Sequence, residues 1–335
     1  MMKNDVPLHG NLAIFVPHLG CAQRCSYCDQ RAISGENDVP TATEVRALCA
    51  QALLKSGSRH MEMAFFGGSF TAVRREYTRP LLEAAAEFLG HGISGIRIST
   101  RPDAIDGEQL DFLRKHGVTA IELGAQSMDD HVLKKNGRGH TAEQTCRASA
   151  LIREWGFELG LQLMTGLDGA DETSDLMSAR ALADLRPDTT RIYPTLVLKD
   201  TDLALRYMGG YYRPPTLSEA VSLVARVMEL FDNQDIRIIR VGLHDTSSMR
   251  AALIAGPWHP AFRELCEGEL MRQRLLLQLG EHGGGEIIVA VRPEDVSRMI
   301  GHKKRNAGLL AQQGFRLSVR AVPGEKALWP RLLTA

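Results

Sequence analysis

The sequence has no long hydrophobic run, no net charge and few cysteines, and each absence excludes a class of protein. No apolar segment approaches the roughly 20 residues of a transmembrane helix, and the first ten residues lack a signal-peptide pattern. The 40 Lys and Arg equal the 40 Asp and Glu, so the chain as a whole is not a basic surface for nucleic acid. Six cysteines in 335 residues do not suggest a disulfide scaffold. We expect a cytoplasmic globular protein without membrane association.

The charge balance is nevertheless uneven along the chain. From Glu286 to the C-terminus there are nine Lys and Arg against four Asp and Glu, a net charge of +5. The rest of the chain is correspondingly acidic. This distribution predicts a basic C-terminal module on a mildly acidic body.

Short apolar segments alternate with longer amphipathic ones over the first 245 residues. The predicted strands are 12–18, 61–68, 95–100, 118–127, 157–167, 189–198 and 236–244. The predicted helices between them are 41–56, 75–90, 106–116, 141–155, 173–185 and 216–233. Nearly continuous apolar strands are typical of a parallel sheet covered on both faces. The pattern predicts an α/β barrel or an open doubly wound sheet, and both place the active site at the carboxyl ends of the strands.

The pattern changes after residue 245. A helix is predicted from about 260 to 282, followed by the glycines 283–285. A strand, a helical stretch and a second strand follow, at 286–291, 293–313 and 315–322. We therefore predict three parts, an α/β domain over 10–245, a helical extension over 246–284 and a small basic α+β module over 285–335.

Three of the six cysteines lie within eight positions, directly after the first predicted strand. Cys21, Cys25 and Cys28 follow a C-x3-C-x2-C spacing. Zinc sites usually have four ligands, and His18 is the nearby residue that would complete one. An iron–sulfur cluster is favoured, because three thiolates leave one of four irons open to an external ligand. The other cysteines are scattered, and two of them are expected to be small core residues of helices, Cys49 and Cys146.

The segment CAQRCSYC, with Tyr27 just before the third cysteine, resembles the cluster loop of the radical S-adenosylmethionine (SAM) superfamily. The resemblance implies a [4Fe–4S] cluster on Cys21, Cys25 and Cys28, with SAM chelating the fourth iron. It also implies reductive cleavage of SAM to a 5′-deoxyadenosyl radical that abstracts hydrogen from a substrate. In such enzymes the protein supplies ligation, orientation and exclusion of water.

Further segments at the predicted strand ends extend the resemblance. The segments PHLGC, FGGSFT, TRPD, ELGAQS, NGRGHT and IYPTLV resemble the radical domain of the Elongator catalytic-subunit-like (Elp3-like) family, from about residue 10 to 215. This implies a partial (β/α)6 TIM-like barrel with the cluster and SAM at its top. The residues implied in SAM binding are Tyr27, Gly67, Gly68, Ser69, Thr71, Ser99, Arg101, Gln126, Ser127 and Met164. For Arg101 the alternative is an ordinary surface arginine before a proline turn.

The sequence departs from the long members of that family. Those members carry a C-terminal acetyltransferase domain and use acetyl-coenzyme A to modify a wobble uridine of transfer RNA. We expect this protein to lack such a domain, because the sequence stops too soon for one and shows no acetyl-coenzyme A loop, and to lack the basic N-terminal extension. We expect a short, stand-alone relative without acetyl transfer.

The segment 296–319 resembles a KH module, whose GxxG loop holds a nucleic-acid backbone between two helices. Lys303, Lys304 and Arg305 are the residues expected on phosphates. Lys304 stands where the second loop glycine belongs, which puts close approach of the backbone in doubt. The alternative is a charged helix face in contact with solvent.

The leading hypothesis is a radical SAM enzyme that modifies a nucleotide in RNA, either transfer or ribosomal RNA. Its partners would include a reductase or a flavodoxin- or ferredoxin-type electron donor. A second hypothesis is a radical enzyme acting on a small molecule or porphyrin, since GAQS also resembles the haem-related branch of the superfamily. A third is a non-catalytic iron–sulfur or zinc protein that binds RNA or haem. His244 and His259 are further candidates for the substrate pocket, although core or turn roles suit them equally.

Overall fold

The computed structural model of the protein describes residues 10–21, 24–36, 38–56 and 61–334. Most of the N-terminal segment without a signal pattern lies outside these ranges. No helix in the described ranges is both long enough and apolar enough to cross a membrane.

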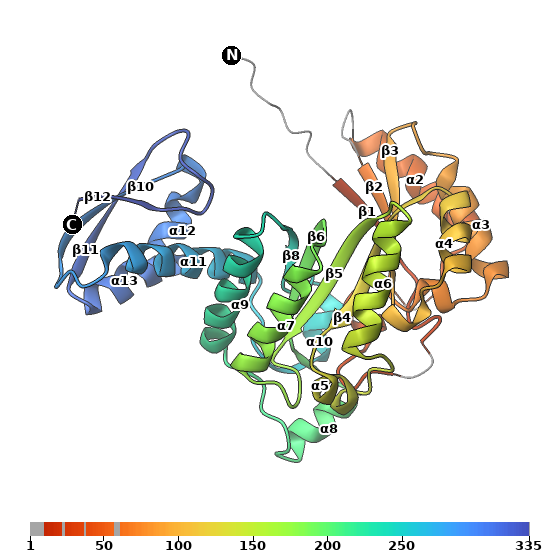
Figure 1. The fold of residues 1–335 in the computed structure, drawn as a ribbon, viewed down its shortest axis with the longest axis horizontal. Coiled ribbons are helices and arrows are strands. Elements are labelled where there is room, and N and C mark those ends of the chain that lie inside the picture. Colours follow the sequence, from red (N-terminus) through yellow and green to blue (C-terminus); the bar gives the residue numbers. More distant parts are fainter. Residues whose placement is uncertain (1–9, 22–23, 37, 57–60, 335) are drawn as a thin grey trace.

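Seven parallel strands form one sheet whose spatial order follows the chain (Figure 1). They are β1 (Gly10–Phe15), β2 (Met61–Phe66), β3 (Ile93–Thr100), β4 (Val118–Gln126), β5 (Glu158–Thr165), β6 (Thr189–Pro194) and β8 (Arg237–Val241). The sheet curls into a half-barrel, and in the described residues β1 and β8 do not pair to close it. The predicted partial TIM-like barrel is therefore confirmed, with seven strands.

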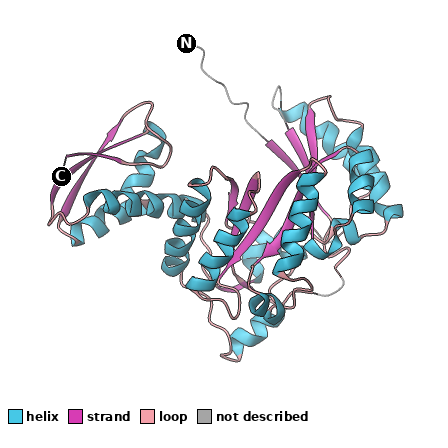
Figure 2. Ribbon diagram, viewed as in Figure 1, coloured by secondary structure: helices cyan, strands magenta, loops and turns pink. Residues whose placement is uncertain are grey.

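Helices cover the outer face of this half-barrel (Figure 2). They are α2 (Ala42–Ser56), α3 (Arg75–Ala86), α4 (Gly107–Lys115), α6 (Ala142–Glu154), α7 (Glu172–Asp184) and α9 (Leu217–Asp232). The shorter helices α1 (Gln30–Ser34), α5 (Asp130–Lys135), α8 (Asp202–Met208) and α10 (Ser247–Ala252) lie in the connections that follow strands. Short 3-10 turns are η1 (Phe70–Ala72) and η2 (Pro102–Ala104). Side-chain caps set several helix starts. Thr141 and Gln144, for example, form a reciprocal capping box at α6.

The two faces of the sheet differ in polarity. Outward-facing strand residues such as Phe65, Ile98 and Ile121 are buried against the helices in the main hydrophobic core. The inner face carries charged residues, because Arg97 pairs with Glu62 at 2.9 Å and Arg191 pairs with Glu122 at 2.7 Å. Removing one partner from such a buried pair typically costs about 3–5 kcal/mol. The inner face of the half-barrel is thus lined with paired charged side chains below the carboxyl ends of the strands.

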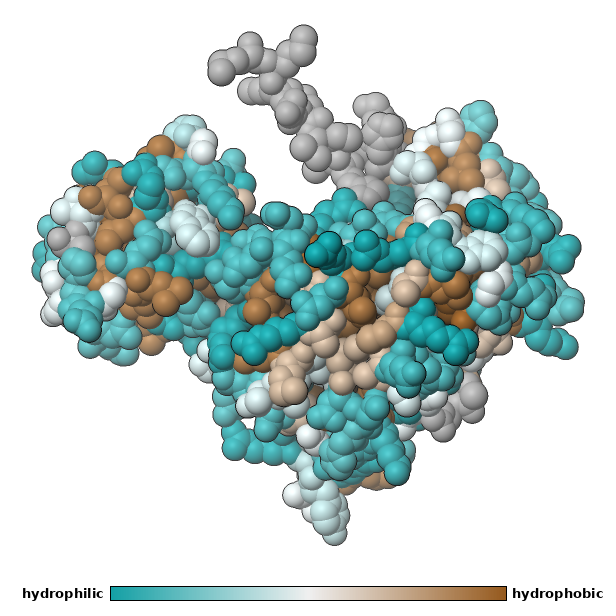
Figure 3. Space-filling model, viewed as in Figure 1, coloured by the Kyte–Doolittle hydropathy of each residue, from teal (hydrophilic) through white to brown (hydrophobic). Residues whose placement is uncertain are grey.

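The C-terminal part has its own small core. It comprises α11 (Phe262–Leu279), β10 (Gly285–Val291), η3 (Pro293–Asp295), α12 (Val296–Ile300), η4 (His302–Lys304), α13 (Arg305–Gln312), β11 (Phe315–Ala321) and β12 (Arg331–Thr334). β10 is parallel to β11 and antiparallel to β12. The N-terminal half of α11 belongs to the main core and its C-terminal half to the small one, so this helix joins the two. On this module Figure 3 shows hydrophobic patches among hydrophilic side chains.

The structure adds detail to the predicted C-terminal elements. The stretch predicted as one helix over 293–313 is two short helices separated by the η4 turn. Strands β12 and β9 (Leu253–Ala255) were not predicted. The strand predicted over 189–198 is divided into β6 and β7 (Val197–Leu198), and β7 pairs antiparallel with β9. These strands are two to four residues long, too short for an alternating pattern to reveal them.

Candidate cofactor and active site

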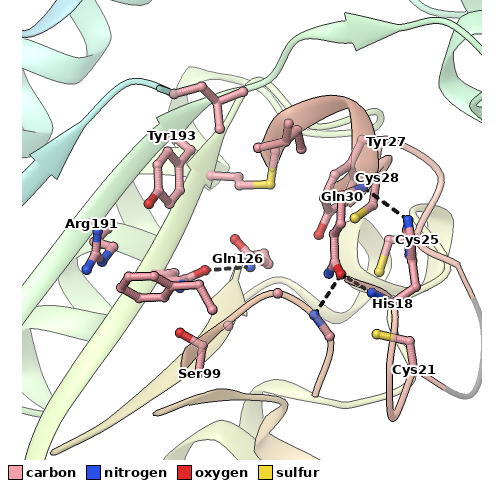
Figure 4. Close-up of a pocket in the computed structure, with 18 of the residues that line it drawn as sticks. His18, Cys21, Cys25, Tyr27, Cys28, Gln30, Ser99, Gln126, Arg191 and Tyr193 are labelled. Carbon is pink, nitrogen blue, oxygen red and sulfur yellow. Dashed lines mark hydrogen bonds between the residues drawn. The ribbon is translucent and has the colours of Figure 1, made fainter. Parts of the chain in front are cut away.

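A pocket of about 230 Å³ lies at the carboxyl ends of the parallel strands. Residues from the loop after β1 line one side of it, and residues of β6 and of the loop after β8 line the other. Figure 4 shows the cysteines on one side of the cavity and Arg191 with Tyr193 on the opposite side. The cavity therefore has two distinct ends.

The cysteine end is formed by the loop that follows β1. Cys21, Cys25 and Cys28 are all half-buried, and all three line the pocket. Burial and the neighbouring thiols Cys25 and Cys21 raise the pKa of Cys28 to about 12, and burial also raises the pKa of Cys21. Three thiolates at this end would need a cationic group among them, which is what iron supplies.

The arrangement fits a cluster better than a single ion. In the ranges that the structure describes, no three His, Cys, Asp or Glu side chains are close enough together to hold one metal ion. His18, which the zinc alternative requires, accepts a hydrogen bond at Nε2 from the Gln30 backbone N–H at 3.1 Å. A four-iron cluster is wider than one ion, so thiols spread around one end of a cavity suit it.

Beside the cysteines, buried polar atoms stand without partners. Arg138 donates from Nη1 to the Cys25 sulfur at 3.2 Å and from Nη2 to the Gly124 carbonyl. The Arg138 Nε and the Tyr27 hydroxyl are buried without a hydrogen bond. Buried polar groups normally have partners. Both side chains line the pocket, so a polar ligand there would satisfy them.

The turn after β2 packs directly on the cysteine loop. Gly67 and Gly68 have φ of +80° and +63°, and a Cβ on Gly68 would lie 2.2 Å from the Leu19 carbonyl oxygen. Only glycine fits there. The Gln30 Oε1 accepts hydrogen bonds from the backbone N–H of His18 and, at 2.7 Å, from that of Gly68 (Figure 4). One side chain thus ties the cysteine loop to the glycine turn.

The end of β4 carries a strained residue that faces the cavity. Gln126 has φ of +68° at a shift in the β4–β5 register. Its Nε2 donates to Gln162 Oε1 at 3.4 Å, and its Oε1 is buried without a partner. Non-glycine residues in this region of conformational space cluster at functional sites. Ser99, also on the pocket wall, donates to Glu122 at 3.4 Å.

The pocket brings together most of the residues expected from the sequence. Its lining includes Cys21, Cys25, Tyr27, Cys28, Gly67, Gly68, Ser99, Arg101, Gln126 and Met164. Arg101 is already paired with Asp103, with Nε at 2.9 Å from Oδ1. His244 also lines the pocket, whereas His259 lies against the His302 ring.

Three expected residues do not line it. The hydroxyls of Ser69 and Thr71 bond to Thr100 Oγ1 at 2.9 and 2.6 Å, and that of Ser127 lies 3.2 Å from Ser178 Oγ on α7. They hold neighbouring strand ends in place. Among the other cysteines, Cys49 is buried as expected, but Cys146 is exposed, so the prediction of a core position for Cys146 was wrong.

Several lining residues were not assigned a role from the sequence. They are Gln30, Gln162, Arg191 and Tyr193, whereas Arg138 belongs to the segment NGRGHT of the family resemblance. One signal was present, namely the charge of Arg191 inside the otherwise apolar strand segment TTRIYPTLVL. Such a charge in a covered sheet points to a polar barrel interior.

Two protein-family models match this chain. The model of the radical SAM superfamily matches residues 15–178, and that of the Radical_SAM C-terminal domain matches residues 187–272. The chain belongs to the radical SAM superfamily. Members of this superfamily are enzymes that use a [4Fe–4S] cluster and SAM, which confirms the predicted enzyme class and cofactors.

Curated radical SAM relatives include Elongator proteins. Elongator complex protein 3 of Saccharomyces cerevisiae is 29% identical over 191 residues, covering 51% of this chain and 34% of the relative. A tRNA uridine(34) acetyltransferase of Dehalococcoides mccartyi is 26% identical over 266 residues, covering 69% and 58%. The chain therefore spans between about a third and three fifths of these relatives.

Solved structures show the same fold. The archaeal Methanocaldococcus infernus Elp3 with an N-terminal deletion superposes with a TM-score of 0.64 at 21% identity, covering 81% of this chain and 63% of that chain. Coproporphyrinogen III oxidase (HemN) from Escherichia coli gives 0.50 at 17% identity, covering 68% and 53%. The Elp3-like resemblance inferred from the sequence is confirmed.

Proposed function

We propose that this protein is a radical SAM enzyme that modifies a nucleotide in RNA, with Cys21, Cys25 and Cys28 holding the cluster. The observation that carries the proposal is the pocket with all three thiols at one end and unpartnered polar atoms on its walls. Support for the RNA substrate comes from relatives named as tRNA uridine(34) acetyltransferases. The basic C-terminal module adds to it.

The chain's own residues would bind and orient SAM. The Gly67–Gly68 turn brings backbone against the cysteine loop without side chains in the way. The Arg138 Nε and the Gln126 Oε1 offer an unused donor and an unused hydrogen-bonding atom to polar groups of SAM. Met164 supplies an apolar wall that excludes water. When bound, the cluster and SAM supply the hydrogen-abstracting radical chemistry of the superfamily.

The turn between α12 and α13 supports contact with RNA. Lys303 and Lys304 are exposed, with φ of +49° and +61°. Lys304 thus has the left-handed backbone that the glycine of a GxxG loop would favour, although it has a side chain. Arg305 instead donates from Nη2 to Ser218 Oγ on α9 at 2.8 Å. We therefore assign phosphate contact to the two lysines and a positioning role to Arg305.

The test is anaerobic reconstitution with iron and sulfide, reduction in the presence of SAM, and chromatography for 5′-deoxyadenosine. Formation is measured alone, with bulk tRNA, with rRNA and with coproporphyrinogen, and Cys25→Ala serves as the control. We expect product from the wild type, more product with one RNA pool, and none from the variant. Stimulation by the porphyrin and not by RNA would refute the RNA substrate. No product from the wild type under any condition would refute the radical chemistry.

A further inference from the structure

Two arginines stand side by side at the end of the half-barrel away from the cysteines, where Arg191 lines the pocket and Arg240 lies next to it on the neighbouring strand. Arg191 on β6 and Arg240 on β8 are direct partners in the parallel ladder. The register shifts by one residue immediately before this pair, between Thr190 and Arg191. Such a bulge re-aims a side chain next to a site. Because paired residues of neighbouring strands point to the same face, the bulge places Arg240 on the inner face beside Arg191.

The carboxylates nearby do not balance these two charges. Arg191 donates from Nε to Glu122 Oε2 at 2.7 Å, but its Nη2 is buried without a hydrogen bond. Arg240 donates from Nε to the Gly242 carbonyl at 2.8 Å, and no ion pair to it is found among the described residues. Like charges directly opposite each other destabilise a sheet. The pair therefore carries one positive charge in excess.

A nearby arginine shows what a purely structural role requires. Arg97, on the same inner face of the sheet, is 1% exposed and pairs with both Glu62 and Glu158, at 2.9 and 2.7 Å. Its charge is fully compensated within the protein. Arg191 has one carboxylate and Arg240 has none, so the two neighbouring strands together carry one positive charge that the described residues do not compensate.

The surroundings suit a ligand with both polar and apolar parts. Tyr193 lies beside the Arg191 guanidinium, which also stacks on the Phe66 ring at 4.6 Å. His244 lines this end of the pocket, and partial burial together with Arg240 and Arg191 lowers its pKa. At neutral pH it is therefore an uncharged imidazole with one N–H to donate. Figure 4 shows Arg191 and Tyr193 across the cavity from the cysteines.

We propose that Arg191 binds an oxyanion of the substrate, namely a phosphate group of the nucleotide being modified, and that Arg240 beside it supplies a second positive charge. The inference rests on the proposed function and deepens it. Guanidinium groups present several N–H donors in a plane and bind phosphate oxygens in pairs. A phosphate held at this end would leave the base or sugar of the nucleotide in the middle of the cavity, between the arginines and the cysteine end.

The test measures binding of small probes to the anaerobically reconstituted full chain, saturated with SAM. Isothermal titration compares uridine 5′-monophosphate, uridine, inorganic phosphate and propionate. Arg240→Gln is the main variant, and Arg237→Gln is its matched control, because Arg237 is an exposed residue of the same strand. Since Arg191→Gln alone would leave Glu122 buried and unpaired, the second variant combines Arg191→Gln with Glu122→Gln. Circular dichroism checks that each variant folds.

We expect the monophosphate to bind about tenfold or more tighter than uridine, as for a charge-assisted hydrogen-bonded contact. This advantage should be lost in the variant that combines Arg191→Gln with Glu122→Gln, reduced in Arg240→Gln and kept in Arg237→Gln. Equal affinity of the two probes, or an advantage that is unchanged in the first two variants, would overturn the proposal. A parallel loss of SAM affinity would also overturn it, since the arginines would then serve the cofactor. Binding of propionate but not of phosphate would assign the site to a carboxylate and would refute the proposal that it holds the phosphate of a nucleotide. Persisting RNA-stimulated formation of 5′-deoxyadenosine would then leave the proposed function standing.

Discussion

Gln30 is predicted to hold the cysteine loop and the glycine turn in one arrangement. Its Oε1 accepts the backbone N–H of both His18 and Gly68, residues 12 and 38 positions away in the chain. Gln30→Leu keeps most of the side-chain volume and removes the acceptor. Gln30→Glu keeps an oxygen at the same place.

The magnitude follows from the two lost hydrogen bonds. Each contributes a net of about 1 kcal/mol, and more where the N–H is left without water. Both donors are only partly buried, so water replaces part of the loss. We expect the leucine variant to be about 2 kcal/mol less stable than the wild type, equivalent to a roughly 30-fold change in an equilibrium constant. The glutamate variant should recover most of that difference.

The assay is urea denaturation of the apo-protein, followed by iron and sulfide determination after reconstitution. Gln51→Leu, at an exposed position on α2, controls for the substitution itself. We expect lower stability and lower iron content in Gln30→Leu alone. A stability within about 0.5 kcal/mol of the wild type, the usual range for a neutral surface change, together with full iron occupancy, would refute the reasoning.

A buried carboxyl, the glycine turn and the two exposed lysines give three further predictions. Burial raises the pKa of Asp175 to about 7, above its value in the unfolded chain. The wild type should therefore lose stability as the pH rises from about 4 to 7. Urea denaturation across pH should show Asp175→Asn to be more stable than the wild type at pH 8 by up to about 4 kcal/mol. A pH-independent difference would contradict this. Gly68→Ala should lower the free energy of unfolding by about 2–4 kcal/mol in calorimetry, through backbone strain plus a clash with a carbonyl oxygen. The control Gly90→Ala should show the strain alone, because Gly90 has φ of +77° and its Cβ would meet nothing within 4 Å. Equal losses of stability in the two variants would argue against the clash. The double variant Lys303→Ala with Lys304→Ala should lower the salt slope of RNA binding by about 1–2 in filter-binding titrations, and an unchanged slope would remove these lysines from the interface.

Much of the architecture was predictable, because it is encoded in short stretches of chain. Nearly continuous apolar runs marked all seven strands of the half-barrel, and the cysteine spacing of 21, 25 and 28 marked the loop that lines one end of the pocket. Strand ends carry the polar residues that meet at the pocket, so the sequence was enough to name Ser99 and Gln126. These features depend on neighbours in the sequence, where periodicity and spacing are visible.

Other features depend on contacts between distant segments, and no local pattern reveals them. The hydroxyl of Ser127 bonds to Ser178 on a helix 51 residues further along the chain instead of lining the pocket. A one-residue register shift brings Arg240 opposite Arg191, and Gln30 joins two loops. Strand register and long-range hydrogen bonds are decided by how the whole sheet twists and packs. The sequence therefore determined the family, the strands and the cysteine loop, whereas the folded chain determined which polar side chains face one another across the pocket.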